Sequence, residues 1–180
     1  YKLRTRRMTL EQIGWRFSMG ENRNYGDILN CSCLLAMPKY FEESIVMSTD
    51  SKSGDRSTFS GSPLIDFESN DSIVGMSLFF RTHRTPISQK HSLGLVVREG
   101  RDLIFLYDLC IYPNQQKSHM DRKSRKAFYG SHIHILGEVK STNLNYDSIT
   151  WHDCLEIFAK DTNIKLESSK ILGPFDGELI

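Results

Sequence analysis

The sequence predicts an α+β fold: a mainly antiparallel sheet with a short N-terminal helix and a C-terminal helix packed on it. Two observations predict this class. Apolar stretches of strand length occupy the middle of the chain, and two of them are joined by the turn residues Glu99-Gly100. Stretches with helical spacing of apolar residues lie nearer the two ends. The 180 residues are expected to form a single domain, residues 1–180.

The first predicted element is a short helix near the N-terminus. Thr9 and Gln12 have the spacing of a capping box, in which each side chain satisfies the other's backbone N–H. Leu10 and Phe17 lie on one helical face, so a helix is predicted over residues 10–18.

Two strands and a loop are predicted next. The apolar run 28–37 is predicted as a strand that ends before Pro38, and residues 44–49 as a second strand. The stretch 49–62 is rich in Ser, Asp and Gly, and its composition is typical of an exposed loop.

The middle of the chain carries the strongest strand signals. Apolar, partly alternating residues predict strands at 73–82, 92–98, 102–112 and 131–139. The second and third of these form a predicted β-hairpin, because only the turn at Glu99-Gly100 separates them.

A second exposed loop is predicted over residues 113–130, between the last two strands. It contains the densest positive charge of the chain, which we assign to nucleic-acid phosphates. The candidate binding residues are Arg122, Lys123, Arg125 and Lys126. The alternative is a loop whose charges are only solvated.

The C-terminal helix is predicted over residues 151–161. Thr150 and Asp153 have capping-box spacing, and Trp151, Leu155 and Phe158 fall on one helical face.

Composition narrows the class of protein. The formal net charge is +1, so a general attraction to nucleic acid is not expected and any basic surface must be local. No apolar run approaches the ~20 residues of a membrane helix, and no apolar leader core follows the basic start, so no membrane partner and a cytoplasmic location are expected. The four cysteines are predicted to be reduced.

The most informative motif is His132-Ile133-His134 in the predicted strand 131–139. Side chains alternate between the two faces of a strand. His132, His134, Glu138 and Lys140 are therefore predicted to share one face, opposite Ile133 and Ile135. Two imidazoles, a carboxylate and an ammonium in one row favour a metal or acid–base site. The alternative is a half-exposed strand face with no site.

Three chemistries fit this row of residues. His132, His134 and Glu138 resemble the first half of the cupin metal motif, and that resemblance implies a transition-metal site on a small β-barrel. Glu138-Val139-Lys140 resembles the E-x-K half of the PD-(D/E)xK nucleases. That resemblance implies an Mg²⁺ cofactor held by Asp108 and Glu138, with Lys140 beside the attacking water.

The third chemistry needs no metal. His132 and His134, with His119 as a further candidate, would act as general base and general acid on an RNA phosphodiester. The neighbouring cations would stabilise the charge that develops on the phosphate.

The C-terminal third also resembles a group of small uncharacterised bacterial proteins. The matching residues are the His-x-His strand and the later helix, which ends near Asn163-Ile164. Some similar proteins belong to toxin–antitoxin loci, so the resemblance implies a nucleic-acid target in a bacterial or phage conflict system. The expected function is phosphodiester cleavage. The alternative is a non-catalytic inhibitor or antitoxin-like component that binds a protein partner.

Overall fold

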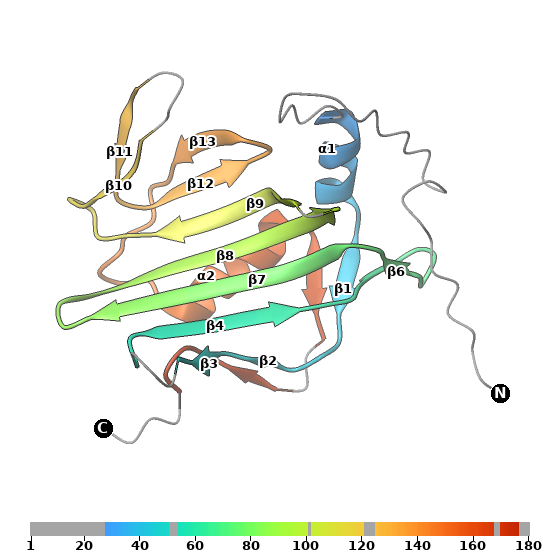
Figure 1. The fold of residues 1–180 in the computed structure, drawn as a ribbon, viewed down its shortest axis with the longest axis horizontal. Coiled ribbons are helices and arrows are strands. Elements are labelled where there is room, and N and C mark those ends of the chain that lie inside the picture. Colours follow the sequence, from blue (N-terminus) through green and yellow to red (C-terminus); the bar gives the residue numbers. More distant parts are fainter. Residues whose placement is uncertain (1–27, 51–53, 101, 121–124, 168–169, 177–180) are drawn as a thin grey trace.

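A seven-stranded sheet forms the centre of the computed structural model, which describes residues 28–50, 54–100, 102–120, 125–167 and 170–176. Its strand order is β13-β12-β9-β8-β7-β4-β3, and every neighbouring pair is antiparallel. The bounds are β3 Ser48–Thr49, β4 Arg56–Gly61, β7 Met76–Thr85, β8 Ser88–Glu99, β9 Asp102–Ile111, β12 His132–Ile135 and β13 Glu138–Ser141. Figure 1 shows this sheet face-on.

Smaller sheets surround the central one. A four-stranded sheet has the order β14-β1-β5-β6, and two further pairs are β10 with β11 and β15 with β2. The bounds are β1 Lys39–Phe41, β2 Ile45–Val46, β5 Leu64–Asp66, β6 Ser72–Ile73, β10 Lys117–Met120, β11 Ala127–Tyr129, β14 Ile164–Leu166 and β15 Ile171–Leu172.

Helix α2, Trp151–Asp161, covers one face of the central sheet, behind the strands in Figure 1. Its buried residues are Trp151, Cys154, Leu155 and Phe158. The Phe158 ring packs edge-on against Phe80 of β7 and Tyr107 of β9, with centroid distances of 5.2 and 5.8 Å. The apolar core therefore lies between α2 and the sheet, and the opposite face, called the outer face below, carries the polar side chains.

The predicted fold class is confirmed, and so are its main elements. Helix α2 matches the predicted helix 151–161, and its N-terminus has both halves of the capping box. Strands β7, β8, β9 and β12 overlap the predicted strands, and β8 pairs with β9 across the predicted turn. The predicted helix 10–18 lies outside the described residues.

Two predicted strands are each divided: 44–49 into β2 and β3, and 131–139 into β12 and the start of β13. Three other predictions about elements are wrong. The run 28–37 forms helix α1, Ile28–Ala36, rather than a strand. The stretch 49–62 is not all loop, because β4 forms there and pairs with β7 along its whole length. The segment 113–130 contains the β10–β11 hairpin. A run of apolar residues cannot distinguish a buried helix from a buried strand, and polar residues form a strand when a partner strand supplies the hydrogen bonds.

Candidate functional site

The pairing of β9 with β12 assembles the site. His132 lies opposite Cys110, and His134 lies opposite Asp108. Directly opposed residues of an antiparallel pair point to the same face of the sheet. Two residues from each strand therefore form a compact polar group.

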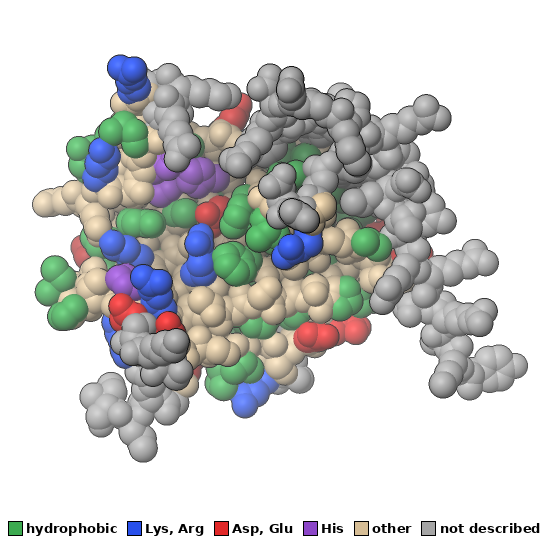
Figure 2. All heavy atoms as spheres, in the orientation of Figure 1, with side chains coloured by type: hydrophobic (Ala, Val, Ile, Leu, Met, Phe, Trp, Pro, Cys, Tyr) green, Lys and Arg blue, Asp and Glu red, His purple; other side chains and the backbone are tan. Residues whose placement is uncertain are grey.

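This group lies on the outer face. Ile133 and Ile135, which alternate with the histidines, pack against the apolar core. The predicted separation of His132 and His134 from the two isoleucines is confirmed. In Figure 2 the histidines form a purple patch that faces the viewer, on the side of the sheet away from α2.

The two imidazoles contact each other directly. Their Nε2 atoms are 3.1 Å apart, so one nitrogen donates a proton to the other. His132 is only 2% exposed, and its Nδ1 lies 3.3 Å from the Gly130 carbonyl oxygen. When Nδ1–H donates to that carbonyl, the Nε2 lone pair of His132 points toward His134.

A third imidazole comes from a different sheet. His119 on β10 places its ring centroid 4.8 Å from that of His134 and 5.7 Å from that of His132. The sequence separates His119 from His132 by thirteen positions, and the β10–β11 hairpin brings them together. We call His119, His132 and His134 the histidine cluster.

Cys110 and Asp108 border the histidine cluster on β9. Cys110 is 7% exposed, and ligand atoms of Cys110, His132 and His134 all lie within 4.8 Å of one another. The Asp108 carboxylate accepts a hydrogen bond of 2.7 Å from the Ser92 hydroxyl on β8. The donor set therefore contains one sulfur and two imidazole nitrogens, with a carboxylate alongside.

Burial controls the proton affinity of these groups. Desolvation lowers the pKa of both His132 and His134, and the neighbouring imidazoles lower it further. Burial, followed by the charge of Asp108, raises the pKa of Cys110 well above its usual value. Near neutral pH the two histidines are therefore neutral and the cysteine is a thiol.

Glu138 and Lys140 do not belong to this group, and their prediction on the histidine face is wrong. The chain reverses at Leu136-Gly137, where φ is 50° and 85°, and β13 then folds back along β12. Lys140 lies opposite Ile133 and Glu138 opposite Ile135, so both point to the other face. They form an exposed ion pair of 3.7 Å.

The predicted Mg²⁺ pair is not assembled either. Asp108 shares the face of His134, whereas Glu138 points to the opposite face and lies on a strand two positions away in the sheet. Two strand spacings amount to about 10 Å, too far for both carboxylates to bind one ion.

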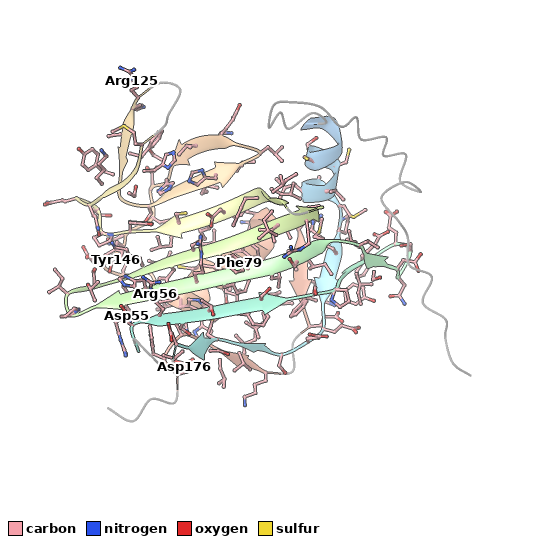
Figure 3. The ribbon with its side chains drawn as sticks, viewed as in Figure 1. Asp55, Arg56, Phe79, Arg125, Tyr146 and Asp176 are labelled. Atoms are coloured by element: carbon pink, nitrogen blue, oxygen red, sulfur yellow. The ribbon has the colours of Figure 1, made fainter. Side chains whose placement is uncertain are left out.

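The predicted basic loop contains the β10–β11 hairpin, which lies beside the rest of the histidine cluster because it carries His119. Arg125 and Lys126 are exposed near its tip, as Figure 3 shows for Arg125. The ammonium of Lys126 lies 5.3 Å from the centre of the Phe128 ring. Arg122 and Lys123 lie outside the described residues.

Two further cation–aromatic pairs extend the positive charge across the outer face. The Arg81 guanidinium lies 5.2 Å from the centre of the Phe79 ring on β7, and Figure 3 labels this ring. The Lys90 ammonium on β8 lies 5.4 Å from the Tyr112 ring, which in turn contacts the imidazole of His132. The sequence contained no local signal for this surface, because these residues come from separate strands.

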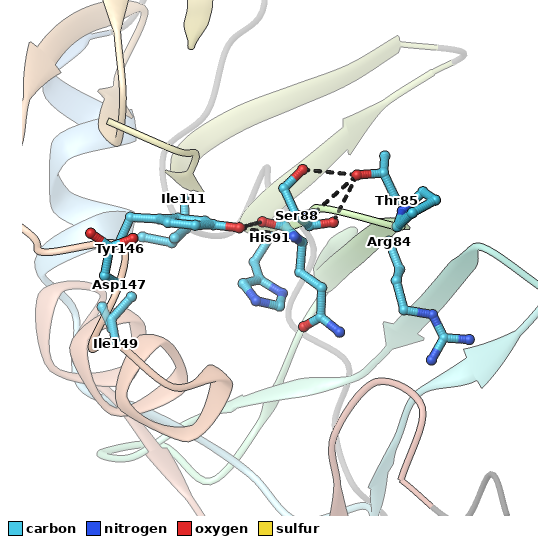
Figure 4. A pocket seen from close by; sticks show the side chains of 10 residues that line it. Arg84, Thr85, Ser88, His91, Ile111, Tyr146, Asp147 and Ile149 are labelled. Carbon is cyan, nitrogen blue, oxygen red and sulfur yellow. Dashed lines mark hydrogen bonds between the residues drawn. The ribbon is translucent and has the colours of Figure 1, made fainter. Parts of the chain in front are cut away.

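An open hollow of about 470 Å³ lies at the β7–β8 hairpin, next to the segment that precedes α2. Figure 4 shows that its polar groups already bind one another. The Tyr146 hydroxyl donates to the Gln89 carbonyl and accepts from the Gln89 N–H, while Thr85 and Ser88 bond each other. Arg84, His91, Tyr146 and Asp147 also line this hollow, but no group of metal-binding donors is found there, so the histidine cluster is the better candidate site among the described residues.

Sequence patterns indicated the histidines of the cluster, with His119 as a further candidate, but not Cys110 beside them. His132 and His134 stood out by their alternation. Cys110 was not predicted as a site residue, because the register between β9 and β12 is not visible in either strand alone. The spacing Asp108-x-Cys110-x-Tyr112 did contain the signal that one face of that strand is polar.

The described part of the chain contains no helix long and apolar enough to cross a membrane. No family model, curated protein or solved structure matches this chain.

Proposed function

We propose that the protein acts on nucleic acid and cleaves a phosphodiester at the histidine cluster. One observation carries the proposal: three imidazoles from two different sheets meet on an outer face that also carries cations stacked on aromatic rings. Proton-transferring side chains next to phosphate-binding ones are what phosphodiester cleavage requires.

The protonation of the cluster suits this chemistry. Because burial lowers the pKa of His134, its imidazole is neutral and can accept the proton of an RNA 2′-hydroxyl. The 2′-oxygen then bonds to phosphorus while the bond from phosphorus to the 5′-oxygen breaks. His119 acts as the general acid and donates the proton that the leaving 5′-oxygen needs. The products are a 2′,3′-cyclic phosphate and a 5′-hydroxyl.

The cation–aromatic pairs suit a single-stranded substrate. Bases of any sequence stack on aromatic rings, and Lys or Arg beside those rings neutralise the backbone phosphates. Arg81 and Lys90 lie on the neighbouring strands β7 and β8. Lys90 lies over the ring of Tyr112, and that ring contacts His132. A single-stranded nucleic acid bound along these rings would reach the histidine cluster.

Replacing a cluster histidine tests the proposal directly. Wild-type protein should cleave RNA and leave single-stranded and duplex DNA intact, because DNA lacks the 2′-hydroxyl that attacks the phosphorus in this mechanism. The variants His119→Ala and His134→Ala should each lose about 10²-fold or more in rate, because each removes a proton-transfer partner. His152→Ala, an exposed histidine on α2, is the matched control and should retain full activity. Activity that survives both cluster variants would contradict the proposal.

The basic hairpin gives a second test. Replacing Arg122, Lys123, Arg125 and Lys126 together with Ala should weaken nucleic-acid binding and flatten its dependence on salt, since each lost phosphate contact lowers the slope by about one. Stability should change little, because exposed charges contribute only ~0–1 kcal/mol each. Lys140→Ala with Lys165→Ala is a control at other exposed sites. Equal binding by the hairpin variant and wild type would exclude the hairpin as the contact surface.

The alternative of a non-catalytic protein with a protein partner has a distinct outcome. Neither wild type nor any variant would then bind or cleave the three nucleic acids.

A further inference from the structure

We infer that Cys110, His132 and His134 form a binding site for a transition-metal ion of the zinc class. The inference rests on the same cluster as the proposed function and changes one role in it. A bound ion would occupy the lone pair of His134, so an ion-activated water would take the place of His134 as the proton acceptor. Of the two metal sites expected from the sequence, the Mg²⁺ site between carboxylates is replaced, and the cupin-like site keeps its two histidines but has Cys110 in place of Glu138.

The spacing of the donors is close to that of a bound ion. Zinc bonds of about 2.0–2.1 Å to nitrogen in a tetrahedral arrangement place two nitrogen ligands about 3.3 Å apart. The two Nε2 atoms are 3.1 Å apart. A tetrahedral ion places sulfur and nitrogen ligands about 3.6 Å apart. Since all three donors lie within 4.8 Å of one another, the sulfur needs to approach by at most about 1.2 Å.

The hydrogen bond between the imidazoles marks where the ion would sit. Two nitrogens that share one proton can also share a cation that replaces it, once the rings turn toward an ion on one side of the line between them, as a tetrahedral angle requires. His132 already has its other nitrogen directed at the Gly130 carbonyl oxygen, which is the support that metal-binding histidines usually have. His134 needs only to carry its proton on Nδ1 instead of Nε2 to become a ligand.

Asp108 favours a cation and disfavours a nucleophilic cysteine. The carboxylate hydrogen-bonds Cys110 and is fixed on its other side by Ser92. A negative group beside a buried sulfur opposes a free thiolate, so a cysteine–histidine nucleophile is poorly supported here. The same negative charge stabilises a dication next to that sulfur.

The donor set also selects the class of metal. One thiolate and two imidazoles suit zinc, cobalt or copper, whereas magnesium and calcium prefer oxygen ligands. Three protein ligands leave a fourth position, as in catalytic zinc sites. The ring of His119, from the neighbouring hairpin, lies 4.8 Å from that of His134, close to the proposed ion.

Cobalt titration of the full-length, reduced protein tests the site without any substrate. Wild type should bind one equivalent of Co²⁺ and develop near-ultraviolet thiolate-to-cobalt absorption together with the intense visible bands of a tetrahedral ion. Cys110→Ser should lose the thiolate absorption, and His134→Ala should weaken binding at least tenfold. Cys33→Ser, at an exposed cysteine of α1, and His152→Ala are the matched controls and should behave like wild type.

Two results would overturn the inference: no thiolate absorption in wild type, or unchanged absorption in Cys110→Ser. Circular dichroism of each variant without metal establishes that the fold is retained, and Cys110→Ala replaces Cys110→Ser if the hydroxyl is not tolerated in its buried position. Zn²⁺ competition, which should abolish the cobalt spectrum stoichiometrically, identifies zinc as a ligand of the same site.

The outcomes for metal and for catalysis are separable. Cobalt binding without cleavage of any nucleic acid would support the metal site and refute the proposed function. Cleavage that resists EDTA, in a protein with no cobalt spectrum, would support the proposed function and refute the metal site. Cleavage that EDTA abolishes and Zn²⁺ restores would support both.

Discussion

At the scale of single residues, burial decides what each histidine can do. His91 on β8 is 7% exposed and points into the core, where its Nδ1 lies 2.9 Å from the Thr82 hydroxyl. His132 is equally inaccessible, yet its Nε2 meets the imidazole of His134 on the outer face. The first is a core residue paired with a hydroxyl, and only the second is part of a site.

His91 should make the protein less stable in acid. Burial lowers its pKa from 6.5 to about 4, so below pH 6.5 the unfolded chain binds a proton that the folded chain does not. The contribution of His91 to the unfolding free energy is therefore fully present above pH 6.5 and is lost as the pH falls toward 4. The loss amounts to about 3 kcal/mol. Urea unfolding across this pH range measures the loss.

His91→Gln provides the matching variant, because its amide can still bond Thr82 but does not titrate. Its unfolding free energy should fall less steeply with acid than that of wild type, and His152→Gln should leave the slope unchanged. Equal slopes for wild type and His91→Gln would show that the buried imidazole is not the cause. Some slope should remain in every case, because burial also lowers the pKa of His132 and His134.

At the scale of elements, local signals were sufficient for α2 and insufficient for α1. Helix α2 begins with a capping box that the sequence shows directly. The C-terminal turn of α1 is instead bound by Lys39, whose ammonium donates to the carbonyls of Leu34 and Leu35 and to that of Thr162 far along the chain. No pattern within 28–37 reveals that partner.

Loss of the α2 cap should destabilise the fold measurably. The Thr150 hydroxyl accepts a hydrogen bond from the Asp153 N–H at 3.1 Å, and the Asp153 carboxylate accepts one from the Thr150 N–H at 2.8 Å. Thr150→Ala removes the first and should cost ~1 kcal/mol of unfolding free energy. Ser148→Ala, at an exposed hydroxyl just before the helix, is the control in the same denaturation experiment. A difference below a few tenths of a kcal/mol between the two would argue against the cap.

The same contrast between local and distant causes explains which residues of the candidate site could be predicted from the sequence. Alternation along β12 was enough to predict that His132 and His134 point away from the isoleucines. The turn at Leu136-Gly137 was missed because leucine rarely adopts the positive φ of 50° that it has here. Because this turn was not predicted, Glu138 and Lys140 were assigned to the histidine face, whereas they point to the opposite face.

At the scale of the whole molecule, pairing between distant segments joins the two ends of the described chain. Strand β1 runs parallel to β14, with Lys39 opposite Ile164, and antiparallel to β5 on its other side. Lys39 is 1% exposed, and burial lowers its pKa to about 8. Its hydrogen bonds to backbone carbonyls of α1 and of the segment after α2 compensate for much of that desolvation.

The composition and the strand pattern predicted the fold class because those features depend on short segments. Which strands neighbour one another depends on contacts across the whole chain. The polar row formed by Arg81, Ser92, Cys110 and His132 crosses four strands in successive register, and no window of sequence contains it.

The reversal at Leu136-Gly137 also has a consequence for solubility. It makes β13 the terminal strand of the central sheet, and the free backbone groups of a terminal strand invite pairing with another chain. Glu138 and Lys140 are 76% and 60% exposed on this strand, where charged side chains hinder such pairing. Residues that resembled a catalytic motif thus discourage aggregation, and a chain without both charges would begin to self-associate along β13.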